Sequence, residues 1–238
     1  MNQYVDGDSP SDIEINNLLQ QYQNRQYDGA EKLALYLTER FPDHQFAWKV
    51  LGAILRKRKD VEGALSASQK SVELAPLDAA AHCNLGIIFK ELGCLNESEG
   101  CLRQALALKP DFAEAHNSLG TTLQDLGRLA EAEESLMQAI AFKSNYMEAH
   151  NNLGLTLHQS GKYLAAEASY AKAIVLKPDF AEVYNNLANT LQELGRLEKA
   201  EANWRKAIAL DPYYADAHFN LGVLLKELCR FSEAETQY

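Results

Sequence analysis

The sequence predicts an all-α fold, a solenoid of stacked antiparallel helix pairs. The first indication is a fixed period, because His82, His116, His150 and His218 are separated by 34, 34 and 68 residues. The second is a recurring hexapeptide, written AHNNLG at 149–154 and repeated with small changes at four other places. The third is the regular placement of glycine and proline within the period. A constant period of about 20 to 50 residues is typical of stacked supersecondary units that bury their apolar faces against each other.

Each unit is predicted to contain a helix, a turn and a second helix. Counted from the start of the unit, positions 4, 7 and 11 share one face of the first helix, with leucine at every position 7 from Leu51 to Leu221. Small residues at positions 8, 20 and 27 let the helix axes approach closely. Glycine at position 15, from Gly93 to Gly195, supplies the left-handed backbone of the turn, and proline at position 32 ends the second helix. The complete units are 45–78, 79–112, 113–146, 147–180 and 181–214.

A degenerate unit is predicted at 11–44. Ala30 and Pro42 take positions 20 and 32, but the apolar positions 4, 7 and 11 are filled by Glu14, Asn17 and Gln21. Polar substitution suits a terminal repeat that has one face in water. The letters SDIE at 11–14 indicate a capping box, and residues 1–10 are expected to form a flexible tail.

The last unit, 215–238, is incomplete. Its turn has Cys229 at the glycine position, and the chain stops at Tyr238, within the predicted second helix. Because no polar capping helix follows, we expect little cover on one side of three leucines, Leu221, Leu224 and Leu225. We expect a fragment of a longer protein. The alternative is self-association, or another partner, covering this C-terminal edge.

This pattern resembles the tetratricopeptide repeat (TPR) family over residues 11–238, because six registers agree at eight positions. The resemblance implies a right-handed solenoid of about six and a half repeats. It also implies that the first helices line a concave inner surface, with positions 2, 5, 6, 9, 12 and 13 facing inward. The expected function is that of a protein–protein interaction module.

Asparagines recur at these inner positions. They are Asn84, Asn117, Asn151, Asn152, Asn185, Asn186 and Asn220 at positions 5 and 6, and Asn189 at position 9. Each carboxamide offers two donors and an acceptor, the groups that a peptide main chain requires at regular intervals. Asparagine within a helix costs about 0.5 kcal/mol relative to alanine, which favours a use, although duplication of an ancestral unit also repeats a residue. The asparagines are similar to a ladder in the TPR arm of O-linked N-acetylglucosamine transferases, which implies that they hold a substrate peptide.

The acidic residues at the inner positions indicate which charge the ligand should have. Glu148 and Glu182 stand at inner position 2, so we expect an acidic groove that binds neutral or basic segments. His158, at position 12, is a further expected peptide contact. A clamp for a terminal carboxylate fits poorly, because Glu114 and Ser118 stand where such a clamp needs cations.

No metal site, cofactor or catalytic centre is expected in this chain. Histidines in successive units should lie about 10 Å apart, too far to share one zinc ion, and position 4 is a packing position. The four cysteines form no CxxC pair, and no phosphate-binding loop is present. We therefore expect a chain that is not an enzyme by itself.

Composition excludes several further classes. Hydrophobic residues make up 47% of the 238 residues, enough for a packed core. The net charge of −10 and pI near 5.1 argue against nucleic-acid and anionic-membrane binding. No apolar run approaches the roughly 18 residues of a membrane span, no secretory signal is visible, and the cysteines fit reduced thiols. A cytoplasmic protein is expected.

Three functions remain open at this level. The first is a peptide-binding module. The second is the substrate-recruiting arm of a larger glycosyltransferase-like enzyme, whose catalytic domain would lie after Tyr238. The third is a structural scaffold that assembles through its C-terminal edge.

Overall fold

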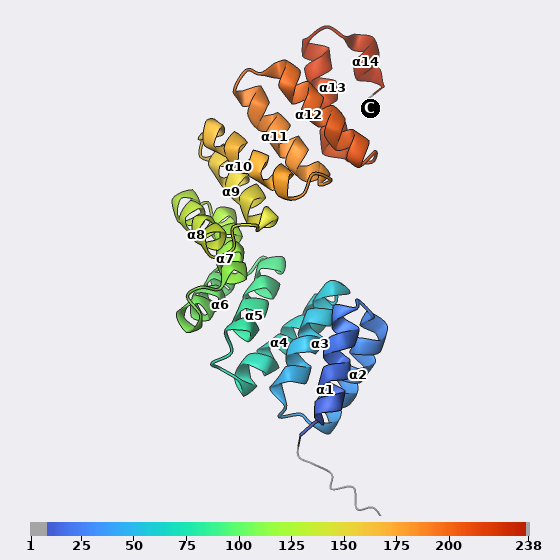
Figure 1. The fold of residues 1–238 in the computed structure, drawn as a ribbon, viewed down its shortest axis with the longest axis vertical. Helices are drawn as coiled ribbons and strands as arrows, with labels where there is room; N and C mark the ends of the chain where they lie inside the picture. Colours follow the sequence, from blue (N-terminus) through green and yellow to red (C-terminus); the bar gives the residue numbers. More distant parts are fainter. Residues whose placement is uncertain (1–8, 237–238) are drawn as a thin grey trace, which may run out of the picture. The chain divides into compact units, whose positions relative to one another are not determined.

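The computed structural model describes residues 9–236, and every secondary-structure element in that range is a helix (Figure 1). The chain divides between Ser118 and Leu119 into two compact units. Of the expected tail at 1–10, only Ser9 and Pro10 are among the described residues, and the last two residues of the chain are outside them.

Unit 1, residues 9–118, contains six helices and the beginning of a seventh. They are α1 (Asp12–Gln23), α2 (Tyr27–Arg40), α3 (Gln45–Lys57), α4 (Val61–Leu74), α5 (Ala79–Glu91), α6 (Leu95–Leu108) and α7 (Ala113–Asp125). The predicted capping box is present at the start of α1. The backbone N–H of Glu14 donates to Ser11 Oγ at 3.3 Å, and the Ser11 N–H donates to Glu14 Oε2 at 2.9 Å.

Unit 2, residues 119–236, contains the end of α7 and the remaining helices. They are α8 (Leu129–Phe142), α9 (Met147–Gln159), α10 (Tyr163–Leu176), α11 (Ala181–Glu193), α12 (Leu197–Leu210), α13 (Ala215–Glu227) and α14 (Phe231–Glu235). Within each unit, consecutive helices pack as antiparallel pairs, and each pair packs against the next (Figure 1). The all-α solenoid of helix pairs is confirmed.

The small residues of the repeat lie at the closest helix contacts. Ala132, Ala166 and Ala200, all at position 20, are fully buried. A Cβ added to Gly154 at position 8 would lie 2.6 Å from Cε1 of Tyr170, so the bulk of the tyrosine fills the space that the glycine leaves. Helix pairing therefore depends on small residues opposite large ones.

The turn within each helix pair has one residue with left-handed backbone. Gly161 has φ +71° and Gly195 has φ +70°. Three turns place a non-glycine residue there, namely Arg25 (φ 59°), Lys59 (φ 64°) and Cys229 (φ 57°). Left-handed backbone costs a residue with a Cβ about 1 kcal/mol, so these three turns are strained relative to the glycine turns.

The position-4 side chains connect successive helix pairs. The Nε2 atom of His150 lies 3.1 Å from the backbone oxygen of Ser144, six residues earlier, and His82 and His116 contact Pro76 and Pro110 in the same way. Trp48, Tyr184 and His218 reach the oxygens of Pro42, Pro178 and Pro212. These histidines therefore stabilise the connections between repeats.

The C-terminal leucines correct an expectation. Leu221, Leu224 and Leu225 are 0–1% exposed, so the expectation that they lack cover is wrong. They belong to the same hydrophobic core as Trp204 of α12 and Ala234 of α14. The reason is that the apolar stripe of α13 faces back into the core, and the short α14 covers the rest.

Candidate functional site

The predicted site residues all lie on the first helices of the pairs. In unit 1, Asn84 is on α5 and Asn117 on α7. In unit 2, α9 carries Asn151, Asn152, Glu148 and His158, α11 carries Asn185, Asn186, Asn189 and Glu182, and α13 carries Asn220. Unit 2 therefore holds most of the predicted site on three helices of the same kind.

Hydrogen bonds between asparagines join α9 to α11. The Nδ2 atom of Asn186 donates to Oδ1 of Asn151 at 3.3 Å, and Nδ2 of Asn151 donates to Oε1 of Glu182 at 3.1 Å. Asn151 is only 4% exposed. Because a buried amide without partners is costly, these two bonds stabilise the contact between α9 and α11.

The same arrangement joins α11 to α13. Asn220 Nδ2 donates to Oδ1 of Asn185 at 3.3 Å and to Oδ1 of Asn189 at 3.1 Å. Asn189 Oδ1 also accepts from the indole N–H of Trp204 at 3.1 Å. Asn185 is 4% exposed, whereas Asn189 and Asn220 are half-buried.

In α9 and α11, positions 5 and 6 therefore have different environments. Asn151 and Asn185, at position 5, are buried between neighbouring first helices, while Asn186 and Asn220, at position 6, remain half-buried. The sequence predicts an inner-surface location for both positions and does not distinguish them. The spacing of 35 residues between donor and acceptor was the available signal, because it pairs position 6 with position 5 of the preceding unit.

His158 contacts the next helix pair. Its Nδ1 lies 3.0 Å from Oγ1 of Thr190 on α11, and its ring packs edge-on against Tyr163 with ring centroids 5.4 Å apart. The Thr190 hydroxyl also donates to the backbone oxygen of Asn186. His158 is half-buried, and its predicted peptide contact stays a prediction.

Unit 1 has an ion pair at the corresponding place. Lys49, at position 5 of α3, contacts Oδ2 of Asp78 at 2.7 Å, and Gln45 Nε2 donates to the same oxygen at 2.9 Å. Burial raises the pKa of Asp78, but the hydrogen bond and charge of Lys49 and two backbone donors outweigh it and lower that pKa. Asn84 lies nearby in sequence on α5 and is half-buried.

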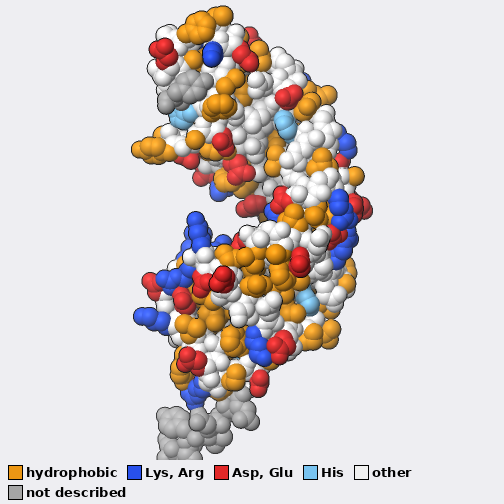
Figure 2. All heavy atoms as spheres, turned by 180° about the vertical axis from the view of Figure 1, so that it is seen from behind, with side chains coloured by type: hydrophobic (Ala, Val, Ile, Leu, Met, Phe, Trp, Pro, Cys, Tyr) orange, Lys and Arg blue, Asp and Glu red, His pale blue; other side chains and the backbone are white. Residues whose placement is uncertain are grey.

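Acidic side chains are dispersed over the face that Figure 2 shows. They lie there singly or in small groups, several of them beside lysine or arginine side chains. Glu148 and Glu182 are both exposed, at the first turns of α9 and α11. Their predicted role in selecting neutral or basic ligands remains a prediction.

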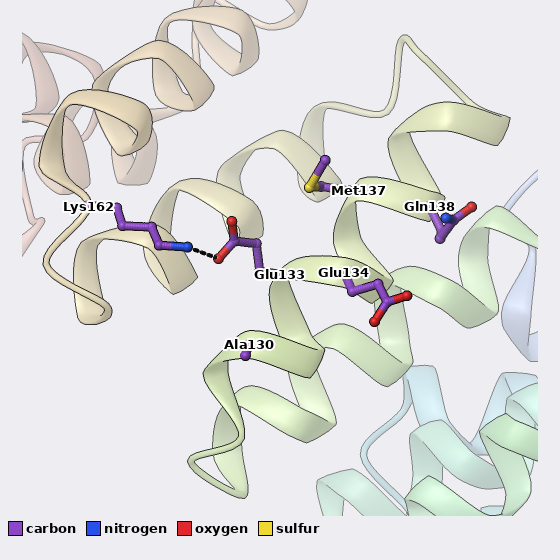
Figure 3. Close-up of a pocket in the computed structure, with 6 residues that line it drawn as sticks. All are labelled: Ala130, Glu133, Glu134, Met137, Gln138 and Lys162. Carbon is purple, nitrogen blue, oxygen red and sulfur yellow. Dashed lines mark hydrogen bonds and ion pairs between the residues drawn. The ribbon is translucent and has the colours of Figure 1, made fainter.

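A pocket lies along the second helix α8 and beside Lys162, the residue before α10 (Figure 3). It has a volume of about 350 Å³ and is lined by Ala130, Glu133, Glu134, Met137, Gln138 and Lys162. Lys162 Nζ contacts Glu133 Oε2 at 2.7 Å on one wall. Arg196 with Glu167 and Arg230 with Glu201 repeat this contact at 2.7 Å, so the pairs join successive repeats.

No group of three or more histidine, cysteine or acidic side chains within residues 9–236 could hold a metal ion. Burial raises the pKa of the Cys83 thiol to about 12, with a smaller contribution from Glu114, so the thiol stays protonated at neutral pH. In the same residues, no helix has both the length and the hydropathy required to cross a bilayer.

Solved structures share this architecture. MamA has a TM-score of 0.61 and 26% identity, over 69% of this chain and 96% of that chain. PilW, described as a type IV pilus biogenesis factor, has a TM-score of 0.80 and 20% identity, over 93% of this chain and 100% of its own. YrrB, described as a TPR protein with an unusual peptide-binding site, has a TM-score of 0.60 and 23% identity, over 77% of this chain and 95% of that chain.

Sequence families give a direct assignment. No curated protein matches the chain. Family profiles described as tetratricopeptide repeat match residues 19–79, 79–112 and 101–134. Profiles described as TPR repeat match residues 122–161, 156–195 and 189–228. TPR proteins are a general protein–protein interaction fold. This chain belongs to the tetratricopeptide repeat family.

Proposed function

We propose that the chain binds extended peptide segments on the surface formed by α9, α11 and α13 of unit 2. The observation that carries this proposal is the set of half-buried asparagines that are held in place but keep unused hydrogen-bonding groups. Asn186 and Asn220 keep their Oδ1 acceptors, and Asn189 keeps its Nδ2 donor, with no partner among residues 9–236.

These groups suit a peptide main chain. The hydrogen bonds to Asn151 and Asn185 fix the orientation of the Asn186 and Asn220 side chains, so little conformational entropy remains to be lost on binding. Neighbouring first helices lie about 10 Å apart, and an extended peptide rises about 3.3 Å per residue. Each repeat therefore meets the peptide about every third residue.

Main-chain recognition makes the binding tolerant of sequence. The exposed carboxylates of Glu148 and Glu182 then favour neutral or basic ligands over acidic ones. YrrB, the structural neighbour described with a peptide-binding site, supports the proposal at the level of the fold.

The test compares two asparagine variants with the parent protein. Peptides are selected from a library of random unstructured sequences, and their Kd values are measured by fluorescence anisotropy. Substituting Asn186→Ala and Asn220→Ala together should weaken binding by about 10-fold, the loss expected for one or two hydrogen bonds.

Asn203→Ala is the matched control, because Asn203 lies on the second helix α12 and its side chain bonds its own helix at Lys199 O. This variant should bind peptides as the parent does. Equal affinity of the double variant and the control, with unchanged helix content by circular dichroism, would contradict the proposal.

A further inference from the structure

Three connections between repeats contain a lysine over an aromatic ring. The lysine stands at position 31 and the aromatic residue at position 34. The Nζ-to-ring-centroid distances are 4.9 Å for Lys109 and Phe112, 4.4 Å for Lys143 and Tyr146, and 4.7 Å for Lys177 and Phe180. The fold thus places an ammonium group on the aromatic ring of this connection, a cation–π contact.

The connection between α12 and α13 departs from this pattern. Tyr214 keeps the aromatic residue, but position 31 is Asp211, and no lysine or arginine of the described chain lies over the Tyr214 ring. A pocket of about 400 Å³ opens at this place. It is lined by Asp179, Phe180, Ala181, Glu182, Leu210, Asp211 and Tyr214.

The chemistry of the pocket suits a cation with an aliphatic stem. Three carboxylates, those of Asp179, Glu182 and Asp211, line it together with the apolar side chain of Leu210 and the ring of Tyr214. The amino end of α11 opposes them with about half a positive charge, and the ammonium group of Lys177, over the ring of Phe180, adds one positive charge. The carboxylates therefore dominate the charge of the pocket.

The pKa of the Tyr214 hydroxyl is affected by the same carboxylates. Burial raises the pKa of Tyr214, and the charges of Glu182 and Asp216 raise it further. The phenol therefore stays neutral at physiological pH. Its ring keeps the electron-rich face that attracts cations.

We propose that this pocket binds a lysine or arginine side chain of the peptide held on α9, α11 and α13. Glu182 links the two sites, because it lines the pocket and also accepts the hydrogen bond from Asn151. The ammonium or guanidinium group would take the place that the position-31 lysine occupies in the three other connections. This inference rests on the proposed peptide-binding function and adds the residue class that the surface selects.

The decisive variant is Asp211→Lys, which introduces the residue found at position 31 in the three lysine-containing connections. Its backbone can accept the change, because Asp211 has φ −134° and ψ 97°, close to φ −146° and ψ 91° at Lys177. The new side chain should cover Tyr214 and exclude the ligand. Glu134→Lys on α8 is the matched control, since it makes the same change of charge at an exposed residue that does not line this pocket.

The first measurement uses small probes and NMR. Nα-acetyl-lysine methylamide should shift the amide resonances of residues 180–182, 210, 211, 213 and 214 in a saturable way, whereas the norleucine analogue should not. The shifts should persist in Glu134→Lys and vanish in Asp211→Lys. Shifts of equal size with norleucine, no shifts in this region, or shifts that persist in Asp211→Lys would each overturn the inference.

The second measurement separates this inference from the proposed function. In a selected peptide, lysine-to-norleucine exchange should weaken binding about 5- to 30-fold in the parent protein, the range of a desolvated cation–π contact, and should have no effect in Asp211→Lys. An equal penalty in both proteins overturns the pocket but leaves peptide binding intact. If the parent protein binds no selected peptide but still shows the saturable shifts with Nα-acetyl-lysine methylamide, only the proposed function is contradicted.

Discussion

The amide of Asn186 donates to the carbonyl of Asn151 across the contact between α9 and α11, with Nδ2 and Oδ1 3.3 Å apart. Asn220 and Asn185 repeat the relationship between α11 and α13 at the same distance. One asparagine of each pair is buried and the other half-buried. The repeated asparagines therefore both stabilise the helix stack and orient the amides that we propose for peptide binding.

Asn151→Ala should destabilise the protein by about 1 kcal/mol, because it removes a buried amide with two hydrogen-bonding partners. The midpoint of urea unfolding measures this change. Asn203→Ala makes the same substitution on α12, where the side chain bonds only its own helix at Lys199 O. It should leave stability unchanged or raise it slightly. Equal effects of the two substitutions would show that Asn151 has no role in the helix stack.

Cys229→Gly should raise stability by about 0.5–1 kcal/mol, because Cys229 adopts φ 57° in a turn where four other repeats have glycine. Lys59→Gly, at φ 64°, should act in the same direction. Thermal unfolding gives the measurement. Gly161→Ala is the reverse change at φ +71° and should destabilise. A loss of stability in Cys229→Gly would mean that the thiol contributes more than its backbone costs.

Gly154→Ala should destabilise by about 1–3 kcal/mol, because the new Cβ would lie 2.6 Å from the buried ring of Tyr170. Gly100→Ala provides the comparison within α6. A Cβ there meets no atom within 4 Å, so the better helix propensity of alanine should stabilise by about 1 kcal/mol. Chemical denaturation measures the change in the free energy of unfolding for both variants. A change in the same direction for both would contradict the close-packing argument.

Glu201→Gln should lower stability at neutral pH by about 0.5–1 kcal/mol, the usual contribution of a surface ion-pair network. The hydrogen bond from Arg230 lowers the pKa of Glu201 in the folded state, although burial opposes it, and Arg205 lowers it further. A lowered pKa stabilises the fold above the unfolded value of about 4.3, and this contribution is lost as pH falls through the folded value. Unfolding midpoints from neutral to acidic pH should therefore converge for parent and variant.

Glu134→Gln serves as the control for this series, since Glu134 is exposed on α8 and forms no ion pair among the described residues. Its difference from the parent should not depend on pH. If the Glu201→Gln difference also stays constant with pH, the ion pairs between repeats do not contribute to the acid dependence of stability.

Much of the fold can be predicted from the sequence, because the 34-residue period determines where each helix pair begins. The apolar stripe and the turn glycines place the first helices at Gln45, Ala79 and each later unit start, where α3, α5 and the later first helices begin. The strained turn at Cys229 was also visible, as a departure from glycine. The burial of Leu221 cannot be predicted in this way, because the period of the repeat does not say which side of a helix packs against the preceding helix.

The site was less predictable for a related reason. Helical periodicity assigns a side chain to a face, but Asn151 and Asn186 differ by their contacts with the neighbouring helix, which depend on the stacking of units. The histidines were identified as packing residues, whereas their bonds to the oxygen six residues earlier appear only in the structure. The pocket at Tyr214 likewise depends on a connection whose position-31 lysine is replaced by Asp211.

The most direct test of main-chain recognition changes the ligand and the protein together. A series of selected peptides in which one backbone amide at a time becomes an ester is titrated against the parent and against Asn186→Ala. At one peptide position, the ester should weaken binding to the parent by about 5-fold, because Asn186 Oδ1 loses its N–H donor, and should have no effect on the variant. An ester penalty of the same size in both proteins at every position would contradict recognition of the peptide backbone by these asparagines.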